Sequence, residues 1–263
     1  MTRALLFDLD DTLIREEPAA VAAFEATAQA AAALCGEVDV AALALDARKR
    51  ARELWSCAST YAYCRSIGMS SWEGLWCRFE GHWPEVRALR QWAPTYRRET
   101  WRLALADQGL TDQELAEQLA ERFGIERRVR HEVFEDVTAT LESLQAWCTV
   151  ALVTNGASCL QREKLEASGL SQYFDAVVIS AEVGVAKPEP SIFTHALSQL
   201  GSTREDGVMI GDSLARDVEG AVAAGLRAVW INRVGVPRPE GRPHFVEIST
   251  LTDLPKVLDL TLG

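Results

Sequence analysis

The chain has 263 residues, of which 48% are hydrophobic and 25% charged, a composition typical of a globular protein with one large or two modest domains. Its formal net charge of −11 argues against a nucleic-acid-binding surface, because binding to a phosphate backbone requires a basic face. A small phosphorylated substrate remains compatible with this charge, since a local site can oppose the overall field.

Composition also bears on the compartment. No apolar stretch approaches the ~20 residues of a membrane span, and Met1-Thr2-Arg3 leads directly into a predicted strand, so we expect neither a membrane span nor a cleaved signal peptide. The cysteines form no CxxC pair and have no histidine at zinc spacing, which predicts reduced thiols rather than disulfides or metal ligands. We therefore expect a cytoplasmic protein, and the sequence does not indicate its oligomeric state.

The first predicted element is a buried strand that is followed directly by acids. The apolar run at residues 4–7 is typical of such a strand, and Asp8-Leu9-Asp10-Asp11-Thr12 comes immediately after it. The carboxylates of Asp8 and Asp10 repel each other and are costly to remove from water unless a cation or a reaction needs them. Open α/β sheets build their active sites at the carboxyl ends of their strands, so this pair is predicted to be catalytic.

Residues 15–130 show no convincing strand pattern, and helical signals dominate there. Pro18 opens an alanine-rich helix that Gly36 can end, and Thr111-Asp112-Gln113-Glu114 is a predicted capping box for a helix that Gly124 stops. The stretch is too long for an ordinary connection, so we predict a second, all-helical domain at 15–130. It holds six of the eight tryptophans; we expect most in its own core and one or two near residues 55–83 facing the substrate.

Four more short runs, at residues 150–153, 176–179, 208–210 and 228–231, are apolar throughout, as in strands covered on both faces. Helical signals lie between them, including a predicted capping box of Ser158 with Gln161. The alternation predicts an α/β fold with a doubly wound parallel sheet, formed by residues 1–14 and 131–263. An edge strand at 245–248 and a short helix at 255–260 are expected to complete it.

The strand ends of a parallel sheet meet at one edge, so distant polar residues are expected to converge there. These residues are Asp8, Asp10, Thr154, Lys187 and Asp212. Three carboxylates in one crevice need neutralising, and Mg²⁺ prefers carboxylates together with water and phosphate oxygens. Asp217, five residues past Asp212, can orient a ligand or a bound water from the first helical turn, or it can simply favour the helix N-terminus.

The remaining strand-end groups suit a phosphoryl group in transfer. Thr154 offers a hydroxyl, the Asn155-Gly156 turn offers backbone N–H groups, and Lys187 offers a full positive charge. One carboxylate can attack phosphorus and form an aspartyl-phosphate. The neighbouring carboxylate can protonate the leaving group and then deprotonate the attacking water.

Four short motifs carry a family resemblance. They are Asp8-Leu9-Asp10-Asp11-Thr12-Leu13, Thr154-Asn155-Gly156, Lys187-Pro188, and Gly211-Asp212-Ser213 with Asp217. In order and in position they resemble the motifs of the haloacid dehalogenase superfamily, and the helical insertion lies where that family has its cap. The segment at 211–233 is similar to the branch of phosphoglycolate, acylneuraminate-9-phosphate and pyrimidine nucleotide phosphatases.

The resemblance implies a role for each matched position. Asp8 would be the nucleophile and Asp10 the general acid and base. Asp8, the main-chain carbonyl of Asp10, and Asp212 would hold Mg²⁺, with Asp217 supporting them. Thr154, Asn155 and Lys187 would bind the phosphate of a small phosphorylated metabolite, and Lys187 would also restrain Asp8.

Other functions within the same superfamily remain open at this point. A 2-haloacid dehalogenase expels halide, which needs no protonation, so it has little use for the second acid Asp10. A phosphonate hydrolase would need a lysine in the cap, and Lys49, which stands there in a charged run, is expected to be solvated. A phosphomutase, or an inactive phosphate-binding protein, is a further alternative.

Overall fold

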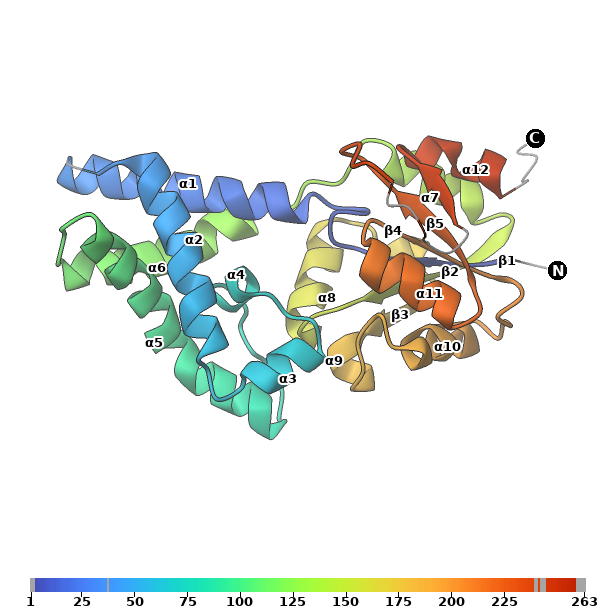
Figure 1. Ribbon diagram of the computed structural model, residues 1–263, viewed down its shortest axis with the longest axis horizontal. Coiled ribbons are helices and arrows are strands. Elements are labelled where there is room, and N and C mark those ends of the chain that lie inside the picture. Colours follow the sequence, from blue (N-terminus) through green and yellow to red (C-terminus); the bar gives the residue numbers. More distant parts are fainter. Residues whose placement is uncertain (1–2, 37, 239–240, 242–244, 259–263) are drawn as a thin grey trace. The chain divides into compact units, whose positions relative to one another are not determined.

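The computed structural model describes residues 3–36, 38–238, 241 and 245–258 and divides them into two compact units. The first comprises the described residues within Met1–Arg15, Val133–Asn155 and Gln161–Gly263. The second comprises the described residues within Glu16–Glu132 and Gly156–Leu160. Figure 1 shows the sheet of the first unit and the helices of the second.

The first unit is built on a six-stranded sheet in which every paired neighbour is parallel. The strand order is β3-β2-β1-β4-β5-β6. The strands are β1 (Arg3–Phe7), β2 (Cys148–Thr154), β3 (Ala176–Ile179), β4 (Gly207–Gly211), β5 (Arg227–Ile231) and β6 (Val246–Ile248). The order runs outward from β1 in both directions, so the expectation of a doubly wound α/β core is confirmed.

Both faces of the sheet are covered by helices. Along β1, Leu5 and Phe7 belong to one apolar cluster, together with residues of α7 (Val137–Leu144) and the C-terminal helix α12 (Leu254–Val257). Ala4 and Leu6 belong to the other cluster, with α10 (Pro190–Gln199) and α11 (Glu219–Ala223). Because alternate side chains of a strand point to opposite faces, the central residues of the core strands are apolar without alternation, which is the pattern seen in the sequence.

Three shorter elements follow β2, β3 and β4. Helix α8 (Ser158–Ala167) follows β2, and α9 (Ser180–Val183) follows β3. A π-helical turn, η2 (Leu214–Val218), follows β4. The last helix begins at Leu254, one residue before the predicted start, and the predicted end at residues 259–260 lies outside the described residues.

The second unit is helical. Its long helices are α1 (Glu16–Cys35), α2 (Val40–Ser56), α5 (Pro84–Asp107) and α6 (Gln113–Arg128), with the short α3 (Tyr61–Ser66) and α4 (Ser71–Gly74) between α2 and α5. Helix α1 packs on α2 and α6, and α5 packs on the same two helices. Phe24, Trp101 and Phe123 are in ring contact at the centre, with centroids 4.5–6.2 Å apart.

Two local predictions for the helical unit are wrong. The N-cap of α6 is Asp112, whose carboxylate accepts the N–H of Leu115 at 3.0 Å, so Thr111 does not start a capping box. Gly124 lies inside α6 and does not stop it. The glycine is fully embedded in a helix that continues to Arg128, where packing outweighs its low helix propensity.

Helix α1 also corrects the expectation about apolar stretches. In the described part of the chain it is the one helix that is long and apolar enough to cross a membrane by length and composition, with a mean hydropathy of 1.2. Its alanines account for this value, and those at positions 20, 23, 28 and 31 are fully buried. The helix begins with Glu16, which is buried in an ion pair with Arg127 of α6, so this face is packed within the helical unit.

The tryptophans of the helical unit differ in burial, and the cysteines form no disulfides. Trp55, Trp76 and Trp101 are buried, whereas Trp83 is 68% exposed. All six cysteines, which lie within the described ranges, are free thiols.

Candidate active site

The sheet brings the predicted residues together from the ends of β1, β2 and β4 and from the loop before α10. Asp8 directly follows β1, and the loop turns back at Asp11, whose φ of +58° is a left-handed conformation that aspartate tolerates. Thr154 ends β2, and Asp212 directly follows β4. All of these residues belong to the first unit.

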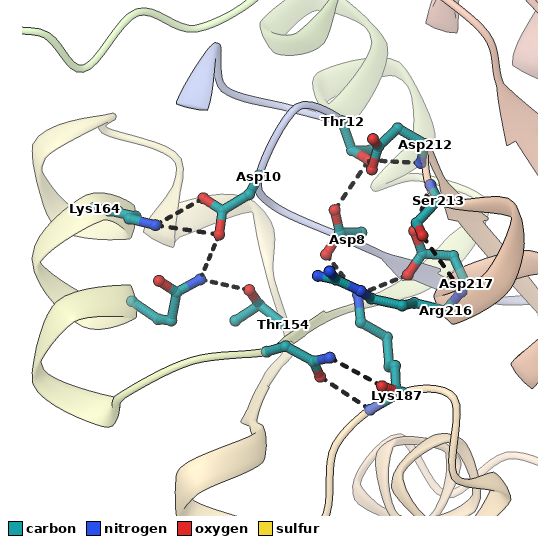
Figure 2. Close-up of polar contacts among 12 residues, drawn as sticks. Asp8, Asp10, Thr12, Thr154, Lys164, Lys187, Asp212, Ser213, Arg216 and Asp217 are labelled. Atoms are coloured by element: carbon teal, nitrogen blue, oxygen red, sulfur yellow. Dashed lines mark hydrogen bonds and ion pairs between the residues drawn. The ribbon is translucent and has the colours of Figure 1, made fainter. Parts of the chain in front are cut away.

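Lys187 and two carboxylates form the centre of the site. Its Nζ lies 2.5 Å from Asp8 Oδ1 and 2.8 Å from Asp217 Oδ1, and all three side chains are buried. Figure 2 shows the ammonium between these two acids. The predicted contact of Lys187 with Asp8 is therefore present in the structure, and Asp217 shares the same ammonium.

Asp8, Asp212 and Asp217 form an acid cluster, and hydrogen bonds fix the second carboxylate oxygens of Asp8 and Asp217. The Thr12 hydroxyl donates to Asp8 Oδ2 at 3.1 Å and accepts the main-chain N–H of Asp212 at 3.0 Å. The N–H of Ser213 donates to Asp217 Oδ2 at 3.0 Å. A Cβ at Gly211 would come within 2.3 Å of Asp217 Oδ2, so only glycine lets Asp217 pack this closely on the end of β4.

The crowding of acids changes their protonation. Burial raises the pKa of Asp8 to about 7, with Asp217 and Asp10 adding to the rise and Lys187 opposing it. Burial, followed by the charges of Asp8 and Asp217, raises the pKa of Asp212 to about 8. Burial disfavours the Lys187 ammonium, but the two carboxylates outweigh it and raise the pKa of Lys187. The single ammonium of Lys187 therefore does not neutralise all three carboxylates of the cluster.

These acids fit a hard divalent cation. One carboxylate oxygen from each of Asp8, Asp212 and Asp217 lies within 4.8 Å of the other two. Mg²⁺ takes oxygen ligands of this kind and commonly uses one or two carboxylates alongside water and phosphate. The raised pKa values of Asp8 and Asp212 mean that their ionised forms are disfavoured in this cluster. A bound cation would stabilise both ionised forms, so these values also support a cation site.

The Asp10 carboxylate is turned toward helix α8 instead of the acid cluster, as Figure 2 shows. Both of its oxygens contact Lys164 Nζ, at 3.1 and 3.2 Å, and Oδ2 also accepts from Gln161 Nε2 at 2.9 Å. Gln161 is thus used by the site. The predicted capping box with Ser158 is wrong, because the Gln161 Oε1 it requires has no hydrogen-bond partner among the described residues.

The phosphate-binding candidates lie beside these acids. Thr154 Oγ1 accepts from Gln161 Nε2 at 2.6 Å. The Asn155 side chain pairs with the main chain of Lys187, accepting its N–H at 2.9 Å and donating to its carbonyl at 3.0 Å. The amide of Asn155 therefore fixes the Lys187 loop, and only its backbone is left for an anion.

Sequence reasoning missed several residues that shape the site. Gln161 and Lys164 stand in a helix whose charged sequence resembles a solvated surface, although both are fully buried. Arg233 donates to the Thr12 carbonyl at 2.9 Å and pairs in bidentate fashion with Asp136 at 2.9 and 3.0 Å, which anchors the loop after β1. Thr12 was also missed, although its place in the first of the four motifs could have identified it.

Comparison with known proteins identifies the family of this chain. Residues 2–225 match the model of the haloacid dehalogenase-like hydrolase family. The chain is 39% identical over 245 residues to a phosphoserine phosphatase of Thermus thermophilus, covering 92% of this chain and 94% of that protein. It is 43% identical over 135 residues to the N-acylneuraminate-9-phosphatase of Mus musculus, covering 50% and 54%.

Among solved structures, the 2-haloacid dehalogenase of Pseudomonas syringae is similar, with a TM-score of 0.61, 29% identity and coverage of 98% and 99% of the two chains. The match to this solved structure and the parallel six-stranded sheet agree on the fold. The chain therefore belongs to the haloacid dehalogenase-like hydrolase family, in its phosphatase branch.

Proposed function

We propose that this protein is a Mg²⁺-dependent phosphatase that hydrolyses a small phosphorylated metabolite through an aspartyl-phosphate on Asp8. The observation that carries the proposal is that two acids of one loop have separate partners. Asp8 is restrained by Lys187 in the acid cluster, whereas Asp10 is held next to Thr154 by Gln161 and Lys164. A nucleophile and a separate proton carrier are what hydrolysis of a phosphomonoester through an aspartyl-phosphate uses.

The proposed reaction has two steps. An Asp8 carboxylate oxygen attacks phosphorus, the bond from phosphorus to the ester oxygen breaks, and the protonated Asp10 gives its proton to that oxygen. The Asp10 carboxylate then takes a proton from a water that attacks the aspartyl-phosphate, which releases inorganic phosphate and restores Asp8. Lys187 and the hydroxyl of Thr154 would bind the phosphoryl oxygens, together with the backbone of Asn155.

Asp8, the main-chain carbonyl of Asp10, and Asp212 would hold the Mg²⁺, with Asp217 supporting them. The ion would supply positive charge that offsets the negative charge of the phosphoryl group and the acids. The fit of the donor set and the raised pKa values of Asp8 and Asp212 support this assignment.

For the substrate, the similarity over nearly the whole chain to a phosphoserine phosphatase makes O-phosphoserine the first candidate, followed by sugar phosphates and nucleotides. We assign the predicted domain at residues 15–130 the role of a cap that excludes water and sets specificity. With six free thiols and a net charge of −11, we propose a cytoplasmic protein without nucleic-acid or membrane partners.

Hydrolysis of p-nitrophenyl phosphate and of a metabolite panel, with Mg²⁺ or with EDTA, tests the proposal. We expect turnover only with Mg²⁺, and a loss of at least about 10⁴-fold in Asp8→Asn. The similarity to a 2-haloacid dehalogenase provides the rival function, so chloride release from 2-chloropropionate is measured in parallel. Chloride release without phosphate release, or full activity in Asp8→Asn, would contradict the phosphatase assignment.

A further inference from the structure

Helix α8 presents two buried polar side chains to Asp10, and neither belongs to the four motifs that carry the family resemblance. Gln161 and Lys164 are three residues apart, so they lie on the same face of the helix. Both are fully buried. Figure 2 shows Lys164 reaching the Asp10 carboxylate from this helix.

The ammonium of Lys164 is fully buried, so it needs a partner of opposite charge. An ammonium is costly to bury unless a counter-charge lies nearby, and Lys164 Nζ lies 3.1 and 3.2 Å from the two oxygens of Asp10. The nearly equal distances mean that the ammonium faces the carboxylate as a whole. Stability alone would be served by an apolar residue at this position, so the ion pair is better explained by the position it imposes on Asp10.

Gln161 links Asp10 to the phosphate-binding candidate Thr154. Its single Nε2 donates to Asp10 Oδ2 at 2.9 Å and to Thr154 Oγ1 at 2.6 Å, using both amide hydrogens. The opposite amide orientation would set Oε1 against the Asp10 carboxylate. Because Thr154 Oγ1 accepts from Gln161, its own hydroxyl hydrogen is left to donate to another group.

We propose that Lys164 and Gln161 are positioning residues for the reaction. Lys164 holds Asp10 where its carboxyl group serves the leaving-group oxygen, and Gln161 fixes the spacing between Asp10 and Thr154. The inference rests on the proposed function, in which Asp10 protonates the departing oxygen.

The dependence of the rate on the leaving group separates this role from a structural one. An alkoxide is a poor leaving group and needs a proton from Asp10, whereas p-nitrophenolate leaves readily without one. We expect Lys164→Met to lower kcat for an alkyl phosphate, with glycerol 3-phosphate as the probe, by about 10- to 100-fold more than for p-nitrophenyl phosphate. Lys164→Arg, which keeps the charge, should bring the ratio of the two rates most of the way back to its wild-type value.

A double-substitution cycle shows whether Lys164 acts through Asp10. Asp10→Asn should lower the ratio of kcat for glycerol 3-phosphate to kcat for p-nitrophenyl phosphate, as Lys164→Met does. Adding Lys164→Met to Asp10→Asn should change this ratio by less than about twofold relative to Asp10→Asn alone. Lys256→Met, at a position on the surface with an 81% exposed side chain, is the matched control and should leave the ratio unchanged. If Lys164→Met does not fold, Lys164→Gln carries the same prediction.

An equal fall for both esters in Lys164→Met, or a further change of the ratio in the double variant, would overturn the inference. If Asp10→Asn leaves the ratio unchanged, the proposed role of Asp10 has failed, and the inference fails with it. If Asp10→Asn shifts the ratio and Lys164→Met does not, the proposed function stands and only the role of Lys164 is wrong.

Discussion

Lys187 and Asp8 form a buried ion pair with 2.5 Å between Nζ and Oδ1, and the same ammonium lies 2.8 Å from Asp217. Asp212 lies within the same cluster. One cation therefore stands among three acids, which is an arrangement suited to binding a further cation and phosphate, and it makes Lys187 important for the fold itself.

Lys187→Met is expected to lower the free energy of unfolding by about 3–5 kcal/mol at pH 8, because it leaves buried carboxylates without their counter-charge. Urea denaturation in EDTA measures the change. Lys256→Met is the control, since the ion pair of Lys256 with Asp253 is exposed and its loss should cost less than about 0.5 kcal/mol. A loss below about 1 kcal/mol in Lys187→Met would contradict the reasoning.

The raised pKa values of Asp8 and Asp212 predict that the metal-free protein loses stability as the pH rises. With folded pKa values of about 7 and about 8, and unfolded values near 3.8, the folded state binds more protons than the unfolded state across this window. The free energy of unfolding therefore falls between about pH 4 and pH 8. Lys187 has a raised pKa and stays charged throughout, so it adds no slope.

Thermal unfolding in EDTA from pH 5 to pH 8.5 tests this dependence. Asp212→Asn removes one of the two titrating acids, so the variant should have a higher Tm than the wild type at pH 8, by roughly 2–4 °C for each 1 kcal/mol gained. The two proteins should converge toward pH 4. Added Mg²⁺ should stabilise the wild type more at pH 8 than at pH 5, because protons compete for its ligands. A Tm that rises with pH in EDTA would contradict the prediction.

The acid cluster could be predicted from the sequence because parallel strands bring their carboxyl ends to one edge. Asp8, Thr154 and Asp212 each stand directly at a strand end, so the positions of the strands were enough. Lys164 could not be found in this way. It lies inside a helix of mixed charge, and only the packing of that helix against the loop after β1 turns a surface-like lysine into a partner of Asp10.

The same limit explains the errors at helix ends. The spacing of Gln161 from Ser158 suits a capping box. The side chain of Gln161 binds Asp10 instead, because a charge-assisted hydrogen bond to a carboxylate is stronger than a neutral bond to the backbone. Gly124 has a low helix propensity, yet α6 continues through it because its flanking residues Leu119 and Phe123 are buried in the helical unit.

The ion pair of Arg233 with Asp136 is partly buried, with 13% of each side chain exposed, so we expect it to stabilise the fold more than an exposed bidentate pair does. Arg233 binds both oxygens of Asp136, lies 3.8 Å from the centroid of the Phe134 ring and donates to the Thr12 carbonyl. Lysine cannot reproduce the planar fork, so Arg233→Lys should lower the free energy of unfolding by about 2 kcal/mol. Because Thr12 contacts both Asp8 and Asp212, kcat should also fall, by about tenfold.

Arg162→Lys is the matched control for this substitution. Arg162 also forms a bidentate pair, with Glu182 at 2.7 and 2.8 Å, but its side chain is 55% exposed. Its loss should cost less than about 0.5 kcal/mol. Equal effects of the two substitutions in urea denaturation would show that burial and the bond to Thr12 do not matter.

Cys159 is predicted to be an unusually reactive thiol. Its Sγ lies 3.6 Å from Cys77 Sγ, and the hydrogen bond from Cys77, opposed by burial, lowers the pKa of Cys159 to about 6. Burial and the same contact raise the pKa of Cys77, so we expect the Cys77 thiol to keep its proton and to donate it to the Cys159 sulfur. The thiolate is the nucleophile, so Cys159 should react with iodoacetamide at a rate that rises with a midpoint near pH 6.

Mass spectrometry of alkylated peptides between pH 5 and pH 9 measures this midpoint for each cysteine. Cys77→Ala removes the donor and should move the midpoint of Cys159 up, toward the value of about 8.5 of an ordinary cysteine. Cys77→Ser keeps a hydroxyl donor at the same position and should hold the midpoint well below that value, because the bond to the thiolate is retained. A midpoint at pH 8 or above in the unsubstituted protein, or identical shifts in the Ala and Ser variants, would show that Cys77 does not stabilise the thiolate.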